Sequence, residues 1–178
     1  ALWLAGAGIA TAVPPWISFL VLTIAGERLE LSRFLPPSPR ARQVFVVIVT
    51  VMLIGALPIP GTLGAARLLF PIALLTLALW LLRQDIARRT VRERGLTRFI
   101  AVCLLTGYGW LAVGALCLLG AGGVLPGTPG YDAGLHAVLL GFVFAMVFGH
   151  APIIFPAILG VRLPYHWLFY LPLLVLHL

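Results

Sequence analysis

Apolar runs long enough to cross a bilayer recur along this chain, and they restrict its fold more than any other feature. A helix needs about 20 residues to span the roughly 30 Å of hydrocarbon. Of the 178 residues, 62% are hydrophobic and only 10% are charged, whereas soluble domains carry roughly 25% charged residues. The short segments of alternating polarity that are typical of a transmembrane barrel do not occur in the sequence. The sequence therefore predicts an all-α fold, a polytopic transmembrane helical bundle.

We expect about six spans in a single integral membrane domain that covers residues 1–178. The spans are predicted at residues 3–25, 44–57, 65–82, 99–121, 133–158 and 165–178. Pro14 and Pro15 lie within the first span, where their missing backbone donors should kink or break the helix. The sequence begins at Ala1 rather than at methionine and stops at Leu178 within an apolar run, so we expect a chain truncated at both ends.

The basic residues are all arginines, and all but Arg67, which lies close to one of the nearly neutral opposite loops, gather in alternate loops. By the positive-inside rule these loops face the cytoplasm and the amino terminus lies outside. This orientation and the compositional bias toward Arg, Ala, Leu, Gly and Pro predict a protein of the bacterial inner membrane. The lipid bilayer is the first of its predicted partners. Nucleic-acid binding is not expected, because membrane topology already explains the net charge of +7. The arginines of these loops are Arg28, Arg33, Arg40, Arg42, Arg83, Arg88, Arg89, Arg92, Arg94, Arg98 and Arg162, of which Arg88, Arg89 and Arg92 are candidates for binding anionic lipid head groups.

The four histidines, His136, His150, His166 and His177, all lie in the last third of the chain. On a regular helix His136 and His150 would share nearly one face, about 21 Å apart along the axis. Two stacked haems on one helix need this spacing, so both residues are candidate ligands for haem or copper. In an antiparallel sixth span His177 would lie near the depth of His150 and could pair with it. His166 lies beside Tyr165 and Trp167, which indicates an interfacial aromatic cluster.

The residues around His150 favour a site that faces protein rather than lipid. Pro152 and Pro156 cannot donate backbone hydrogen bonds, so carbonyl groups are freed on this helix, and Gly149 permits close approach of a neighbour. Two interpretations remain open for His150. It is either a haem or metal ligand, or a structural group that hydrogen-bonds a carbonyl across a helix interface.

One stretch carries a resemblance to a known family. The segment "LHAVLLGFVFAMVFGHAPIIFPAILG", residues 135–160, resembles the late histidine-bearing helix of haem-copper oxidase subunit I, and it is also similar to the nitric-oxide-response haem-copper membrane proteins. The resemblance implies that His136 is a haem ligand. The histidine pair and the tyrosine that hold copper in the oxidases have no counterpart here, so the oxygen chemistry of that family is not implied.

These features predict a multi-pass subunit of a membrane electron-transfer assembly, respiratory or photosynthetic, with b-type haem as its candidate cofactor. Its partners would be the other membrane subunits of the complex, and the chain would not be catalytic on its own. One alternative is a non-catalytic accessory subunit that packs against a larger complex. A small-molecule transporter is the second alternative, although the sequence shows no inverted repeat of spans.

The predicted orientation can be tested with reporter fusions. Reporters fused at Arg40 or Arg92 should report the cytoplasm, and one fused at Gly127 should report the outside, because arginine-rich loops are retained on the cytoplasmic side. The reverse pattern would contradict the arginine argument in every loop at once.

Overall fold

The computed structural model describes residues 9–31, 39–57, 67–160 and 164–178 of the chain. These residues form helices and turns, and no strand occurs among them, which confirms the predicted all-helical class. The elements in chain order are α1 (Ile9–Leu31), α2 (Pro39–Ala56), α3 (Leu69–Gln84), α4 (Ala87–Thr90), α5 (Leu96–Gly120), α6 (Pro129–His136), η3 (Ala137–Phe144), α7 (Ala145–Leu159), η4 (Trp167–Phe169) and α8 (Tyr170–His177).

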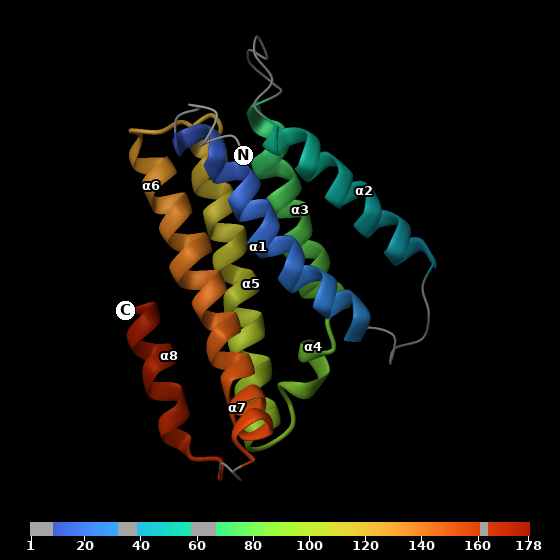
Figure 1. Cartoon of the computed structure of the whole chain (residues 1–178), viewed down its shortest axis with the longest axis vertical. Helices are drawn as coiled ribbons and strands as arrows, with labels where there is room; N and C mark the ends of the chain where they lie inside the picture. Colours follow the sequence, from blue (N-terminus) through green and yellow to red (C-terminus); the bar gives the residue numbers. More distant parts are fainter. Residues whose placement is uncertain (1–8, 32–38, 58–66, 161–163) are drawn as a thin grey trace.

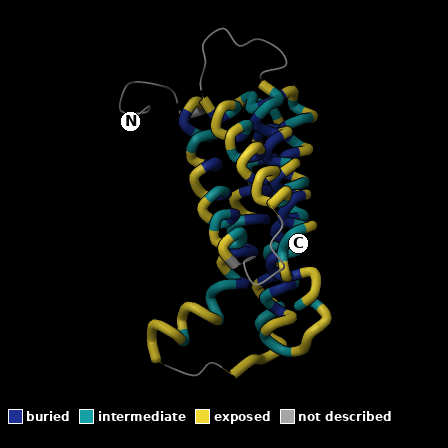
Figure 2. Tube along the Cα trace, turned by 90° about the vertical axis from the view of Figure 1, so that its right-hand side faces the viewer, coloured by how far each residue is buried: buried dark blue, intermediate teal, exposed yellow. Residues whose placement is uncertain are grey.

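The long helix α5 is the centre of the bundle (Figure 1). On one side α5 packs against α3, and on the other it packs against the continuous helix formed by α6, η3 and α7. Helix α2 lies outside α3, and α1 crosses the bundle in contact with α2, α3 and η3. Helix α8 turns back beside η3 and ends partway along the bundle. Buried residues line the inner faces of these helices, and exposed residues lie on the outer faces (Figure 2).

Three helices are long and apolar enough to cross a membrane among the residues described: Pro39–Ala56, Leu96–Gly120 and Pro129–Leu159. The apolar helices Leu69–Gln84 and Trp167–His177 are shorter. Helix α1 has 23 residues, but its last turns contain Glu27, Arg28 and Glu30, which reduce its apolar character. The outer surface is also apolar, since Phe19 is 71% exposed and Ile158 75% exposed. Such a surface needs lipid or another membrane protein to cover it.

The described arginines gather at one end of the bundle. The end of α1, the end of α3, α4 and the start of α5 lie in the lower half of Figure 1, and the start of α2 lies at about mid-height at its right-hand edge. Arg67 precedes α3 at the opposite end, and the predicted loop residues Arg33 and Arg162 lie outside the described part. We call the lower end the arginine-rich end. It is formed by segments that carry Arg28, Arg83, Arg88, Arg89, Arg92, Arg94 and Arg98, and the start of α2 carries Arg40 and Arg42.

The helix boundaries lie within a few residues of most predicted spans. Residues 3–8 of the first predicted span and residues 65 and 66 of the third lie outside the described part. Helix α1 continues through Pro14 and Pro15, so these prolines do not break the first span. Helix α7 likewise continues through Pro152 and Pro156. Membrane helices tolerate such prolines where neighbouring groups satisfy the freed carbonyls.

A π-helical stretch, η3, separates α6 from α7. Its hydrogen bonds link residue i to residue i+5, so its turns hold more residues than those of an α-helix. The expectation that His136 and His150 share one face is wrong, because it assumes a regular 3.6-residue period across all the residues between them. The two histidines accordingly meet different neighbours.

Glycines allow α5 to approach the helix formed by α6, η3 and α7. A Cβ atom on Gly114 would lie 2.7 Å from Val138 Cγ2 and 3.0 Å from the carbonyl oxygen of Gly134. On the facing helix, a Cβ atom on Gly134 would lie 2.8 Å from Leu118 Cγ. Seven residues further along, Gly141 lies so close to Trp110 that no side chain fits between them. Small residues of this kind drive helix association in membranes, where burial of apolar surface gives no advantage over lipid.

The close approach of these helices predicts that replacing a glycine by alanine lowers the stability of the bundle at the interface but not elsewhere. Gly114→Ala and Gly134→Ala should each destabilise the bundle by about 1–3 kcal/mol, because the new Cβ atom meets backbone or a core side chain. Gly109→Ala and Gly120→Ala are the controls, since nothing lies within 4 Å of a Cβ atom at either position. Thermal unfolding in detergent measures the difference, and equal melting temperatures for all four variants would contradict the interface.

Candidate functional site

His150 lies in α7 and makes two hydrogen bonds within the protein. Its Nδ1 atom is 2.5 Å from the backbone carbonyl oxygen of Met146, one turn earlier in the helix. Its Nε2 atom is 2.5 Å from Nη2 of Arg28, which lies near the end of α1. The imidazole therefore links the first described helix to the last long one.

These two partners determine which nitrogen of His150 carries the proton. A carbonyl oxygen only accepts, so Nδ1 must carry a hydrogen and donate it. A guanidinium only donates, so Nε2 must be unprotonated and accept. His150 is thus a neutral imidazole with Nδ1 protonated. Its one lone pair suited to a metal already accepts a hydrogen bond from Arg28.

A second buried polar contact lies beside this one. The hydroxyl of Tyr108 on α5 donates to Oδ2 of Asp85, which follows α3. The other carboxylate oxygen of Asp85, Oδ1, accepts from the backbone N–H of Ala87 at 2.8 Å. The guanidinium of Arg28 lies close enough to Tyr108 to act on it electrostatically, and the Nε atom of Arg28 is buried without a hydrogen-bond partner. We call Arg28, Asp85, Tyr108 and His150 the polar cluster.

His136 ends α6 and is exposed. Its Nδ1 atom lies 2.7 Å from the carbonyl oxygen of Asp132, so this nitrogen also carries the proton and donates. The Nε2 lone pair of His136 points away from that bond. A backbone carbonyl on Nδ1 is the partner that commonly orients a metal-ligating imidazole. Among the histidines, His136 therefore has a possible ligand atom, Nε2, that no described residue contacts.

His177 has the opposite arrangement. Its Nδ1 atom accepts a 2.7 Å hydrogen bond from the indole Nε1 of Trp110 on α5, and the two rings stack with centroids 5.8 Å apart. Because Nδ1 accepts, Nε2 must carry the proton, and this Nε2 is buried without a partner in the described structure. His177 attaches α8 to α5 and presents no free lone pair.

The structure does not bring the predicted pair of His150 and His177 together. His177 lies at the level of Trp110, which covers Gly141, and His150 lies nine residues further along, about 13 Å of helical rise. Helix α8 begins at Tyr170, later than the predicted start of the sixth span at residue 165. No group of three or more His, Cys, Asp or Glu side chains in the described ranges could hold a metal ion. Cys103 and Cys117 are free.

Most of the remaining predicted residues are exposed, and Gly149 is buried. His166 is exposed, and its Nδ1 atom accepts from the backbone N–H of Leu168 at 3.2 Å, which caps η4. Arg88, Arg89 and Arg92 are exposed on α4 and the turn that follows it. Gly149 is buried, and a Cβ atom there would lie 3.1 Å from Cys103 on α5.

A family model described as "Domain of unknown function (DUF8744)" matches residues 1–178. The chain belongs to the DUF8744 family. No curated protein and no solved structure matches the chain.

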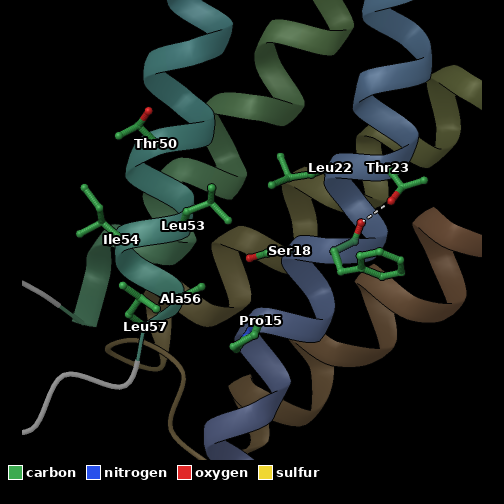
Figure 3. A pocket seen from close by; sticks show the side chains of 10 residues that line it. Pro15, Ser18, Leu22, Thr23, Thr50, Leu53, Ile54, Ala56 and Leu57 are labelled. Atoms are coloured by element: carbon green, nitrogen blue, oxygen red, sulfur yellow. Dashed lines mark hydrogen bonds between the residues drawn. The ribbon is translucent and has the colours of Figure 1, made fainter. Parts of the chain in front are cut away.

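The DUF8744 chain also has a groove of about 690 Å³ between α1 and α2 (Figure 3). The hydroxyl of Ser18 points into it, although Ser18 is only 2% exposed and its Oγ atom has no hydrogen-bond partner. The threonine hydroxyls of Thr23 and Thr50, by contrast, donate to carbonyls one turn earlier in their own helices. The groove is otherwise lined by apolar side chains and holds no titratable group: its lining comprises Pro15, Ser18, Phe19, Leu22, Thr23, Thr50, Leu53, Ile54, Ala56 and Leu57.

Sequence reasoning missed the partners of the histidines in this DUF8744 chain. The sequence marks Arg28 as a topology determinant, and no pattern in it marks Trp110. A signal for Arg28 did exist, because it lies within a turn of the end of an apolar helix and can turn inward. The contact of Tyr108 with Asp85 joins residues 23 positions apart, and no local pattern in the sequence marks it.

Proposed function

We propose that the chain is a multi-pass membrane subunit of an electron-transfer assembly and that it holds a b-type haem through His136. The observation that carries this proposal is the hydrogen bond from Nδ1 of His136 to the Asp132 carbonyl, which leaves the Nε2 lone pair exposed. Haem ligation uses an imidazole in this form. When bound, the haem would supply one-electron transfer.

The other two candidate histidines fit a haem less well. His150 has the same tautomer, but Arg28 occupies its Nε2 atom, so ligation there requires Arg28 to move. His177 gives its Nδ1 lone pair to Trp110 and has a protonated Nε2. The resemblance of residues 135–160 to the haem-ligating helix of oxidase subunit I also favours His136.

The position of His136 favours a site that is shared with a partner subunit. His136 lies on the outer surface of its helix, and Leu139, Leu140 and Phe144, which follow in η3, are also exposed. A flat macrocycle against this face would need protein on its other side. We therefore propose that a neighbouring subunit would supply a further ligand to the haem and would cover this apolar surface.

The proposed topology is six spans in a bacterial inner membrane, with the arginine-rich end in the cytoplasm. The gathering of arginines at one end of the bundle supports this orientation. In that orientation His136 lies toward the outer face of the membrane, because α6 begins at the end of the bundle opposite to the arginine-rich end.

A non-catalytic accessory subunit is the second candidate, and a specific observation favours it. His150 and His177 both join separate helices through hydrogen bonds, with Arg28 and with Trp110. In an accessory subunit these contacts would be the whole role of the histidines, and the exposed apolar surface would pack against the larger complex.

Optical spectra of the chain, purified with its native partners, separate the two candidates. We expect a Soret band and the sharp visible bands of reduced low-spin haem, and we expect His136→Ala to abolish them. His166→Ala is the matched control, because His166 is also exposed but caps η4 through its Nδ1 atom.

Two results would contradict the haem proposal. One is a colourless complex that contains its full set of subunits, which would favour the accessory role. The other is an unchanged spectrum in His136→Ala together with loss of the spectrum in His150→Ala, which would move the ligand to the polar cluster.

A further inference from the structure

A pocket of about 560 Å³ lies at the arginine-rich end, on the side of the bundle where α3, α4 and α5 meet. Its lining residues come from the last turns of α3, from α4 and the turn after it, and from α5. They are Leu82, Arg83, Arg88, Val91 and Leu105. The pocket shares no residue with the polar cluster or with the surface around His136.

The charge of this pocket is positive. Arg83 and Arg88 are both exposed, and among the residues that the structure describes neither guanidinium pairs with a carboxylate. Asp85 lies between them in sequence, but its two carboxylate oxygens accept from Tyr108 and from the backbone of Ala87. Glu93 is exposed and is not part of the lining. An anion in the pocket would therefore meet two guanidinium groups.

The interior of the pocket is apolar. Leu82, Val91 and Leu105 are each half-buried, so each presents part of its side chain to the pocket. Leu105 lies on α5 three residues before Tyr108, whose hydroxyl reaches Asp85 just after Arg83, so Leu105 lies near the level of Arg83. The pocket thus places an apolar surface beside the two guanidinium groups, which suits a phosphate and the adjoining part of an acyl chain.

We propose that this pocket binds one anionic phospholipid. The phosphate would accept hydrogen bonds from Arg83 and Arg88, whose planar guanidinium groups match phosphate geometry, and the first part of an acyl chain would lie on Leu82, Val91 and Leu105. This site differs from the surface patch expected from sequence, because Arg89 and Arg92 do not line the pocket. It is independent of the haem proposal.

The test compares lipid retention in two charge-matched double variants. The intact chain is reconstituted in nanodiscs that contain phosphatidylglycerol and phosphatidylcholine, and the lipids that remain bound after detergent extraction are counted by native mass spectrometry. One retained phosphatidylglycerol per chain is expected. Arg83→Gln with Arg88→Gln should reduce its retention about 30-fold, since each arginine near an anionic lipid contributes about fivefold. Arg89→Gln with Arg92→Gln should change retention less than twofold.

Three outcomes would overturn the site. Equal losses in the two double variants would mean a diffuse attraction of the loop for anionic lipid. Equal retention of phosphatidylcholine and phosphatidylglycerol would mean that the two arginines of the pocket do not select an anionic lipid. Displacement of the lipid by millimolar inorganic phosphate would mean that the pocket binds the anion without its chain. If the double variant unfolds, the single variants Arg83→Gln and Arg88→Gln are measured instead, and each should reduce retention about fivefold.

Discussion

A polar side chain inside a membrane bundle must find its hydrogen-bond partner within the protein, because lipid offers none. This constraint determines what the histidines of the chain can do. His150 has a carbonyl on one nitrogen and Arg28 on the other, and His177 has Trp110 on Nδ1. His136, at the end of α6, is fixed on one side only. This difference in hydrogen-bond partners makes His136 the candidate ligand, whereas His150 and His177 hold helices together.

The same constraint explains how the helices pack. Burial of apolar surface does not favour a bundle over separate helices in lipid, so close backbone approach and interhelical hydrogen bonds must hold the bundle together. Gly114 and Gly134 provide the approach between α5 and its neighbouring long helix. The bond between Arg28 and His150 then joins α1 to α7, which are far apart in the sequence.

The sequence was a good guide to the helices and a poor guide to the site. The fourth predicted span, residues 99–121, nearly coincides with α5 at Leu96–Gly120, because a long apolar run is a strong local signal. The expectation that His136 and His150 share one face does not hold across η3, since nothing in an apolar run distinguishes a π-helical turn from an α-helical one. The partners of His150 and His177 also could not be predicted, because Arg28 and Trp110 lie 122 and 67 residues away from them in the chain.

The central claim is that hydrogen bonds fix the tautomer of each candidate histidine and that, of the three, His136 keeps an unprotonated Nε2 atom that no described residue contacts. Nitrogen NMR of the chain with ¹⁵N-labelled histidine, at an alkaline pH that keeps the imidazoles neutral, measures the tautomers directly, and single His→Gln variants assign the signals. The account predicts protonated Nδ1 and unprotonated Nε2 in His136 and His150, and the reverse in His177. A protonated Nε2 in His136, or the same tautomer in all three residues, would contradict it.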